Sequence, residues 1–232
     1  MAMLLFQVPD APILQIADED SYFPVNRVFC VGRNYAAHAA EMGNEVDREA
    51  PFYFTKSPAS VTRSGATLPY PPETSDYHHE VEFVLAIGSP VFRAGRETAN
   101  GAILAYGVGL DMTRRDLQGL AKDKRRPWDL GKDVEGSAIL APMTRAETFG
   151  PVGSQRIALT VNGNLRQEGH LSDMIHDCAA IVADLSRFYH LVPGDIIMTG
   201  TPSGVGPVVA GDVIEGTVDG LTPVTLTLTE AE

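Results

Sequence analysis

The sequence predicts an α+β fold that is rich in short strands and has a few helices on one side. Three features of the chain favour this fold. From Gly194 onward, short apolar runs alternate with Gly-Asp turns, which is typical of β-structure. Asn162-Gly163 lies between two strand-like runs and suits the type I′ turn of a hairpin. Residues 172–190 repeat apolar side chains with the period of a helix.

The chain has 232 residues, enough for one large domain or two small ones. Its content of 44% hydrophobic and 21% charged residues is ordinary for a globular protein, and we find no internal repeat. Residues 1–20 show little periodicity. We therefore expect an N-terminal arm over residues 1–24 and a single catalytic domain over residues 25–232.

Charge and hydropathy argue against several classes of function. The net charge of −12 disfavours binding to nucleic acid, which needs a basic surface. No apolar run approaches the roughly 18 residues of a membrane helix. The N-terminal MAMLLF is too short for a secretory signal and lacks its basic flank. We expect a cytoplasmic protein without a nucleic-acid or membrane partner, and an anionic ligand would need positive charge gathered locally.

Apolar runs bounded by turn residues predict the strands of the N-terminal half. They cover residues 27–32, 52–56 and 59–62, the last two separated by Ser57-Pro58. Residues 99–111 begin with small side chains and run into AYGVGLD. The glycines there indicate close approach of another segment to a buried strand.

Three segments favour helix or turn. Residues 34–42 (NYAAHAAEM) carry four alanines and no breaker, with Gly43 as the stop. Residues 113–124 form a polar helix or turn. Ser172 is the expected cap of the helix over residues 172–190, which ends before Pro193-Gly194. The apolar face of that helix comprises Ile175, Cys178, Ala179, Val182, Leu185 and Phe188.

The two cysteines, Cys30 and Cys178, fall in a predicted strand and a predicted helix, among apolar neighbours. Two such residues make neither a disulfide framework nor a zinc site. We expect buried free thiols.

Two glutamates open the segment YHHEVEFVLAIG (77–88), where a strand enters the core. Side chains two apart on a strand point to the same face, so Glu80 and Glu82 lie together. Close like charges repel unless a cation neutralises them. Asp111, at the end of another buried strand, can complete a set of three carboxylates. An all-oxygen site of this kind suits Mg²⁺, Mn²⁺ or Ca²⁺.

An exposed edge strand whose polar face meets water is the alternative, and it is the common meaning of an isolated Glu-x-Glu. The apolar remainder of the strand and the presence of Asp111 favour the metal site. The adjacent His78 and His79 point to opposite faces, so both cannot bind one ion. We expect these histidines either to pack in the core or to contact the metal-binding side chains without binding the ion themselves.

A possible general base lies in the predicted helix over residues 34–42. His38 and Glu41 are spaced i, i+3 and therefore share one face. A carboxylate orients an imidazole and raises its basicity, and such a pair can activate water. In isolation, a surface histidine near a surface glutamate is the commoner meaning of this spacing.

Six segments, taken together, resemble the fumarylacetoacetate hydrolase superfamily. They occur in the order typical of that family and span roughly residues 25–228, so the resemblance is highly specific. The segments are VGRNYAAHAAEMG (31–43), YHHEVEF (77–83), GLDMTRRDLQ (109–118), PWDLGKDVEG (127–136), VNGNLRQEG (161–169) and GDIIMTGTPSGVGPV (194–208). The resemblance implies a mixed-sheet β roll or sandwich with a few flanking helices, and a homodimer.

The matching motifs imply a metal site and a base. In the family, the Glu-x-Glu and the later Asp bind Mg²⁺ or Mn²⁺. This implies one ion per subunit at Glu80, Glu82 and Asp111. The family's His-Glu pair lies on a helical lid over the substrate, which implies catalytic roles for His38 and Glu41.

Further positions follow from the same matches. The family's active-site lysine after Pro-Trp corresponds to Lys132, which implies a catalytic role. The Asp-Met-Thr-x-Arg-Asp block places Arg115 and Gln118 at the substrate. The Gly-Thr-Pro loop places Thr201 against a substrate carboxylate.

Two of the matching positions would carry little functional meaning without the family resemblance. Lys56 corresponds to a substrate-site lysine in a Phe-x-Lys-Pro segment, although Ser57 here replaces the usual proline. The Gly-rich segment 200–206 lacks the Lys-Ser/Thr ending of a phosphate-binding loop and does not match the dinucleotide fingerprint. Alone it would be a turn between strands.

The resemblance implies metal-dependent hydrolysis of a carbon–carbon bond in a β-diketo acid. The segment FPVNRVFCVGRNYAAHAAEMG resembles the branch that cleaves fumarylpyruvate to fumarate and pyruvate in aromatic compound catabolism. The same site could serve an oxaloacetate decarboxylase or a 2-oxo-acid isomerase. A protein of another class could merely bind a metal and a 2-oxo acid. The His38–Glu41 pair favours hydrolysis, because a binder needs no water activator.

Overall fold

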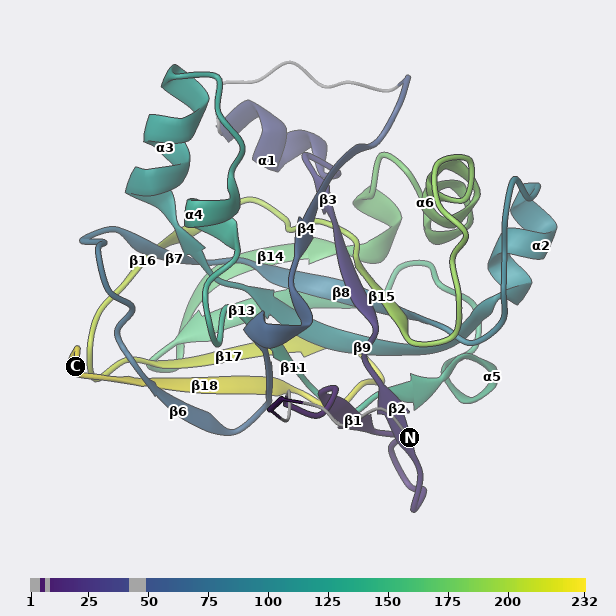
Figure 1. Cartoon of the computed structure of the whole chain (residues 1–232), viewed down its shortest axis with the longest axis horizontal. Helices are drawn as coiled ribbons and strands as arrows, with labels where there is room; N and C mark the ends of the chain where they lie inside the picture. Colours follow the sequence, from purple (N-terminus) through teal and green to yellow (C-terminus); the bar gives the residue numbers. More distant parts are fainter. Residues whose placement is uncertain (1–4, 7–8, 42–48) are drawn as a thin grey trace.

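The computed structural model describes residues 5–6, 9–41 and 49–232. Most of the helices gather along one side of the sheets, as the sequence predicts (Figure 1). The α-helices are α1 (Ala36–Glu41), α2 (Arg96–Gly101), α3 (Arg115–Asp123), α4 (Asp129–Lys132), α5 (Ala146–Phe149) and α6 (Cys178–Leu185). None of the helices in this described part of the chain has the length and apolar character needed to cross a bilayer.

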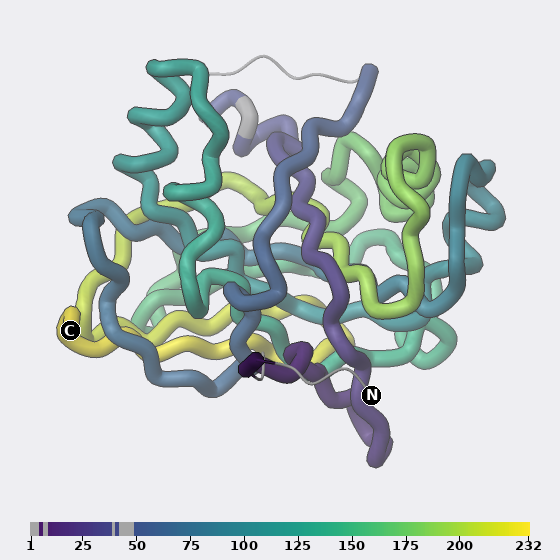
Figure 2. Tube along the Cα trace, viewed as in Figure 1, coloured from purple at the N-terminus to yellow at the C-terminus, as the bar shows by residue number. Residues whose placement is uncertain are grey.

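The largest sheet has eight strands in the order β4-β3-β15-β8-β9-β11-β5, with β12 paired to β9. Figure 2 shows β3 and β4 side by side across the front of the molecule. The strands of this sheet are β3 (Arg27–Gly32), β4 (Phe52–Lys56), β5 (Val61–Arg63), β8 (Val81–Ile87), β9 (Ile103–Asp111), β11 (Ala138–Leu140), β12 (Thr144–Arg145) and β15 (Asp195–Met198).

A second sheet has five strands in the order β14-β13-β17-β18-β6, and two small sheets have the orders β10-β7-β16 and β1-β2. The strands of the five-stranded sheet are β6 (Ala66–Pro69), β13 (Arg156–Val161), β14 (Asn164–His170), β17 (Val213–Val218) and β18 (Val224–Thr229). The small sheets contain β1 (Ile13–Gln15), β2 (Tyr22–Pro24), β7 (Tyr77–His79), β10 (Thr113–Arg114) and β16 (Gly206–Val208).

The main core lies between the two large sheets, and β8 shows how the faces are divided. Phe83 and Leu85 belong to the core cluster that includes the five-stranded sheet. Val84 belongs to a second cluster, which contains Leu14 and Phe23 of the N-terminal hairpin. Because side chains alternate along a strand, the face of β8 that carries Val84 also carries Glu82.

Several sequence predictions are confirmed. The strands over residues 27–32 and 52–56 occur with those bounds, and residues 113–124 form β10 followed by α3. The hairpin between β13 and β14 turns at Asn162 and Gly163, whose φ angles of 52° and 76° are those of a type I′ turn. Cys30 and Cys178 are buried free thiols.

The helix predicted over residues 172–190 is shorter than expected. A 3₁₀ turn covers Leu171–Asp173, and α6 begins only at Cys178, where the Asp177 side chain accepts a hydrogen bond from the Ala180 N–H at 2.9 Å. The predicted cap, Ser172, is therefore wrong. Before α6, the backbone N–H of Ile175 donates instead to the Asn34 carbonyl at 2.8 Å. Further on, Phe188 is 64% exposed, contrary to its predicted place on the apolar face.

Other boundaries also differ from the sequence predictions. The first residues of the predicted 99–111 strand are the end of α2, and a 3₁₀ turn over Pro58–Ser60 occupies half of the predicted 59–62 strand. The predicted N-terminal arm, whose residues 1–20 show little periodicity in the sequence, contains the β1–β2 hairpin, and Leu14 of this hairpin is buried. Gly43, the predicted stop of α1, lies outside the described residues.

Candidate active site

Three carboxylates converge where β7, β8 and β9 meet. Glu80 connects β7 to β8, Glu82 lies in β8, and Asp111 ends β9. One oxygen from each lies within 4.8 Å of the others, and all three residues are buried. The chain is not one continuous strand here, because β7 and β8 belong to different sheets. The predicted cluster of three carboxylates nevertheless forms, and the exposed edge strand does not.

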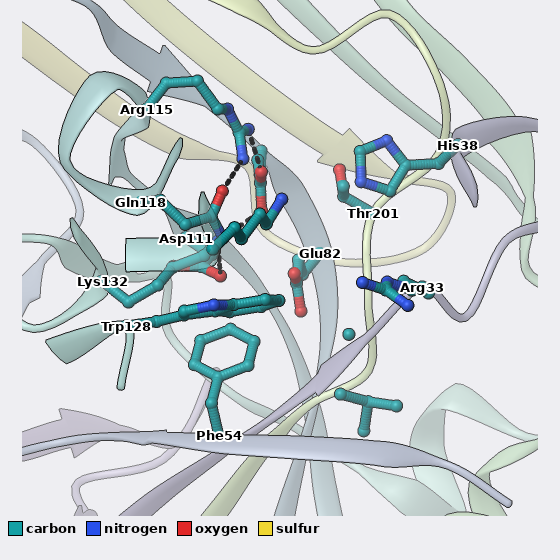
Figure 3. Close-up of a pocket in the computed structure, with 14 residues that line it drawn as sticks. Arg33, His38, Phe54, Glu82, Asp111, Arg115, Gln118, Trp128, Lys132 and Thr201 are labelled. Carbon is teal, nitrogen blue, oxygen red and sulfur yellow. Dashed lines mark hydrogen bonds and ion pairs between the residues drawn. The ribbon is translucent and has the colours of Figure 1, made fainter. Parts of the chain in front are cut away.

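Basic side chains surround two of the carboxylates (Figure 3). Lys132 Nζ lies 2.8 Å from Glu80 Oε2 and 2.7 Å from Asp111 Oδ2. Arg115 forms an ion pair with Glu80. Burial opposes the charge on Glu80, but Lys132 and Arg115 outweigh this effect and hold its pKa well below the usual range. Glu80 is therefore ionised.

Glu82 has no such partner. Its Oε2 accepts a hydrogen bond from the Gly200 N–H at 2.7 Å, and among the described residues no cationic side chain forms an ion pair with it. Burial, reinforced by the charges of Asp111 and Glu80, raises the pKa of Glu82 well above its ordinary value. Of the three carboxylates, Glu82 is therefore the one that no cationic side chain of the described residues pairs with. This donor set fits a hard divalent cation.

His38 lies beside this cluster and is only 7% exposed. In Figure 3 its ring points toward the neighbouring Thr201. Its Nδ1 lies 3.3 Å from Glu41 Oε2, so Nε2 is the nitrogen left for a ligand. Burial lowers the pKa of His38 although Glu80 and Glu41 oppose this, so the ring is neutral at neutral pH.

The partner of His38 is itself held in place. Glu41 is exposed, and both of its carboxylate oxygens accept from the Gly204 N–H at 3.1 Å. Gly204 has φ +94°, and a Cβ there would lie 2.1 Å from the Arg166 carbonyl oxygen. Only glycine fits this position. The sequence did not indicate this contact between α1 and the Gly-rich loop.

Thr201 lines the pocket and is oriented by a residue that the sequence predictions missed. Gln167 Nε2 donates to Thr201 Oγ1 at 2.7 Å and to the Pro202 carbonyl at 2.8 Å. The Gln167 Oε1 accepts from the Val81 N–H at 3.0 Å and lies 3.1 Å from His79 Nδ1. Since Thr201 Oγ1 accepts from Gln167, its hydroxyl proton is directed to another acceptor, such as a ligand oxygen.

Arg115 and Gln118 line the pocket together, as predicted from the sequence, with Arg115 Nη1 donating to Gln118 Oε1 at 2.7 Å. His78 contacts the same arginine, because Arg115 Nε donates to His78 Nδ1 at 3.4 Å. His78 therefore contacts a pocket residue, Arg115, directly, whereas His79 is connected to the pocket residue Thr201 through Gln167.

Lys56 occupies a different place from the one implied by the resemblance. It is 2% exposed and is not among the pocket-lining residues; its Nζ lies 2.9 Å from Asp111 Oδ1 and donates to Ser137 Oγ at 2.8 Å. The adjacent Ser57 uses both its N–H and its hydroxyl as donors to Asp133 Oδ1, each at 2.9 Å. A proline could make neither bond.

Among the pocket residues that were not identified from the sequence, two are aromatic and two are basic. Trp128 and Phe54 form an aromatic wall, with ring centroids 5.9 Å apart. Arg33 and Lys122 add positive charge to the same pocket. The single tryptophan, in the PWDLGKDVEG segment, was the available signal for this wall.

Comparisons with known proteins agree with this geometry. The family model described as fumarylacetoacetate (FAA) hydrolase C-terminal matches residues 27–229. The chain is 52% identical to a fumarylpyruvate hydrolase from Ralstonia sp. over 194 residues, which are 82% of this chain and 100% of that protein. It is 40% identical to an Escherichia coli oxaloacetate tautomerase over 199 residues, covering 85% and 90% of the two chains.

Among solved structures, a fumarylpyruvate hydrolase from Pseudomonas aeruginosa in complex with Mn²⁺ and pyruvate is similar to this chain. The TM-score is 0.94 at 42% identity, and the match covers 98% of this chain and 100% of that one. The strand-rich α+β architecture is therefore shared between the two proteins.

Proposed function

The chain belongs to the fumarylacetoacetate hydrolase family, and we propose that it hydrolyses the β-diketo acid fumarylpyruvate to fumarate and pyruvate. One observation supports hydrolysis as the type of reaction. A neutral imidazole, His38, lies in the same pocket as three buried carboxylates that fit a divalent cation. The substrate follows from the full-length match to the Ralstonia fumarylpyruvate hydrolase.

Glu80, Glu82 and Asp111 are the residues that would hold Mg²⁺ or Mn²⁺. The lack of a cationic partner for Glu82 among the described residues supports this assignment, as does the Mn²⁺ in the similar Pseudomonas structure. A bound cation supplies a Lewis acid that polarises the substrate's 2-oxo and neighbouring oxygens and stabilises the enolate charge left when the carbon–carbon bond breaks.

His38 acts as the general base. It takes a proton at Nε2 from the water that attacks the distal carbonyl of the substrate. Glu41 bonds Nδ1 and thereby fixes the orientation and tautomer of the ring. The Glu41 contact with Gly204 holds this pair against the loop that carries Thr201.

The remaining polar residues bind substrate oxygens. Arg115, Gln118 and Lys132 present donors along one side of the pocket, and Thr201 presents its hydroxyl opposite them (Figure 3). Burial opposes the charge on Lys132, but Asp111 and Glu80 outweigh it and raise the pKa of this lysine, so it remains a cation that can stabilise developing negative charge.

Lys56 is a positioning residue in this account. Its buried ammonium fixes Asp111 from behind and does not reach the pocket. The local positive charge of Arg115 and Lys132 also explains how a protein of net charge −12 accepts an anionic substrate.

Oxaloacetate tautomerisation is the second candidate, favoured by the 40% identity to the Escherichia coli tautomerase. It requires proton transfer but no attacking water. Purified protein with Mn²⁺ should be assayed with fumarylpyruvate, acetylpyruvate and oxaloacetate. We expect fumarate and pyruvate from the first. Turnover of oxaloacetate alone would exclude the hydrolase.

The variant His38→Ala separates an enzyme from a binding protein. It should lose at least about 100-fold in kcat for hydrolysis, the typical contribution of a general base, while Mn²⁺ affinity stays unchanged. Retained turnover would remove His38 from the mechanism.

We further propose that the catalytic domain of residues 25–232 works in a cytoplasmic homodimer, as the family resemblance implies. Light scattering should give roughly twice the chain mass of 24.9 kDa. A monomer in solution would contradict this assembly.

A further inference from the structure

The charges that line the pocket are distributed unevenly. At the carboxylate cluster, each base is matched by an acid. Lys132 pairs with Glu80 and Asp111, and Arg115 pairs with Glu80. Two more cations, Arg33 and Lys122, line the same pocket, and within the described part of the chain neither forms an ion pair.

Lys122 lies on α3 and is half-buried. Its Nζ lies 5.0 Å from the centre of the Trp128 ring, so an aromatic face is its neighbour in place of a carboxylate. Burial, with the positive charges of Arg115 and Arg33, lowers the pKa of Lys122 to about 8. Because the positive charges of Arg115 and Arg33 also act at this ammonium, an anion placed there would be stabilised.

Arg33 approaches from the other side of the pocket, directly after β3. Figure 3 shows its guanidinium extending toward the centre of the pocket, across from the Trp128 indole. Its guanidinium carbon lies 5.8 Å from the centre of the Phe52 ring. Its backbone φ is +60°, which is uncommon for a residue with a side chain. The neighbouring Asn34 fixes this turn through side-chain bonds to the carbonyls of His176 and Thr199.

We propose that Arg33 and Lys122 together bind the second carboxylate of the substrate and so select dicarboxylic over monocarboxylic 2-oxo acids. This inference rests on the proposed function, since it assumes that the 2-oxo acid end binds at the carboxylate cluster. Fumarylpyruvate carries such a second carboxylate at the far end of its acyl chain. Acetylpyruvate has a methyl group in the corresponding acyl portion.

Binding of uncleavable analogues tests this inference without turnover. 2-Oxoheptanedioate has the chain length of fumarylpyruvate, and 2-oxoheptanoate differs from it only in having a methyl group in place of the terminal carboxylate. Neither contains a β-diketone to cleave. By calorimetry with Mn²⁺ present, the wild-type protein should bind the dicarboxylate at least about tenfold more tightly, the ratio expected for a good charge-assisted contact.

The variants Arg33→Gln and Lys122→Gln should each reduce this preference, and the double variant should abolish it, while affinity for 2-oxoheptanoate changes less than about twofold. Arg33→Lys should restore part of it. Arg125→Gln and Lys124→Gln are matched controls, because both residues are exposed, neither lines the pocket, and Arg125 also has a positive φ of 53°.

Two results would overturn the inference. One is a wild-type protein that binds both analogues equally. The other is a preference that survives in the double variant. Failure of the proposed function has a different signature, because wild-type protein would then leave fumarylpyruvate uncleaved, while the comparison of the two analogues would still decide the carboxylate site.

Discussion

At the scale of single residues, Glu82 is the main reason to expect a bound cation, because no cationic side chain of the described residues pairs with it. Glu80 and Asp111 have lysine or arginine partners, whereas Glu82 has the Gly200 N–H. In the folded protein without a cation, the pKa of Glu82 lies above the ordinary 4.5, because of burial and its two acidic neighbours. The folded chain then holds a proton that the unfolded chain releases, so this group contributes stability below about pH 4.5 that is lost as pH rises through the folded pKa.

A cation that binds the cluster must displace that proton. We therefore expect Mn²⁺ binding to release protons and to weaken as pH falls. Calorimetry in buffers of different ionisation enthalpy measures the number released. Glu82→Gln should abolish the release and weaken Mn²⁺ binding by at least about tenfold, the lower range for loss of a ligand-shell contact. Binding that is independent of pH and unchanged in this variant would remove Glu82 from the metal site.

Gln167 connects the buried YHHEVEF segment to the loop that carries Thr201. Gln167→Leu removes the donor to Thr201 Oγ1 and leaves the Val81 N–H without its acceptor. We expect the free energy of unfolding to fall by about 1–3 kcal/mol and KM to rise, measured by urea titration and steady-state kinetics. Gln155→Leu is the control, since its amide bonds only within its own loop. Equal KM values in both variants would contradict this role.

The sequence predicted the residues of the carboxylate cluster because their spacing has a direct geometric meaning. Strand periodicity predicted that Glu80 and Glu82 share one face, Asp111 was added because it ends a second buried strand, and the family resemblance implied that all three bind one ion. Arg33, Lys122 and Gln167 could not be placed by spacing, because their positions depend on contacts between segments far apart in the chain. Lys56 was assigned to the substrate by family resemblance, and only the fold shows it behind Asp111.

At the scale of elements, α6 shows that a local sequence pattern can predict a helix without predicting the residue at which the helix begins. The apolar period continues through residues 172–177, yet the backbone there bonds to Asn34 outside the helix. Asn34 lies between β3 and α1, so the same contact fixes the approach to His38. The tertiary bond therefore overrides helical propensity at a place that also supports the site.

Capping of α6 can be tested directly. Asp177→Ala should lower the free energy of unfolding by about 1 kcal/mol, because the Ala180 N–H loses its acceptor. Asp177→Asn keeps a capping oxygen and should stay within a few tenths of the wild-type value. Ser172→Ala should behave as wild type in the same urea titration. A larger loss of stability in Ser172→Ala than in Asp177→Ala would contradict this assignment and support Ser172 as the cap.

At the scale of the whole molecule, long-range strand pairing assembles the pocket. β3 pairs in parallel with β15, which places Arg27 opposite Asp195 although the two residues are far apart in the sequence. This pairing brings the loop after β3, which carries Arg33, next to the loop after β15, which carries Thr201. No local pattern predicts such a pairing; the family resemblance supplied the architecture.

The same assembly concentrates positive charge where the substrate would bind, in a chain whose net charge is −12. Hydrolysis requires water to enter the reaction, and in the proposed mechanism His38 activates that water. Tautomerisation and decarboxylation on the same residues would not add water to an acyl carbon. The fate of solvent oxygen therefore separates these reactions.

Hydrolysis at the distal carbonyl can be observed by running the reaction of fumarylpyruvate in ¹⁸O-labelled water and analysing the fumarate by mass spectrometry. We predict that fumarate gains one ¹⁸O atom in the carboxylate formed from the distal carbonyl, and that His38→Ala forms labelled fumarate at least about 100-fold more slowly. Failure of the wild-type protein with Mn²⁺ to form fumarate, or formation of fumarate without the label, would contradict the account.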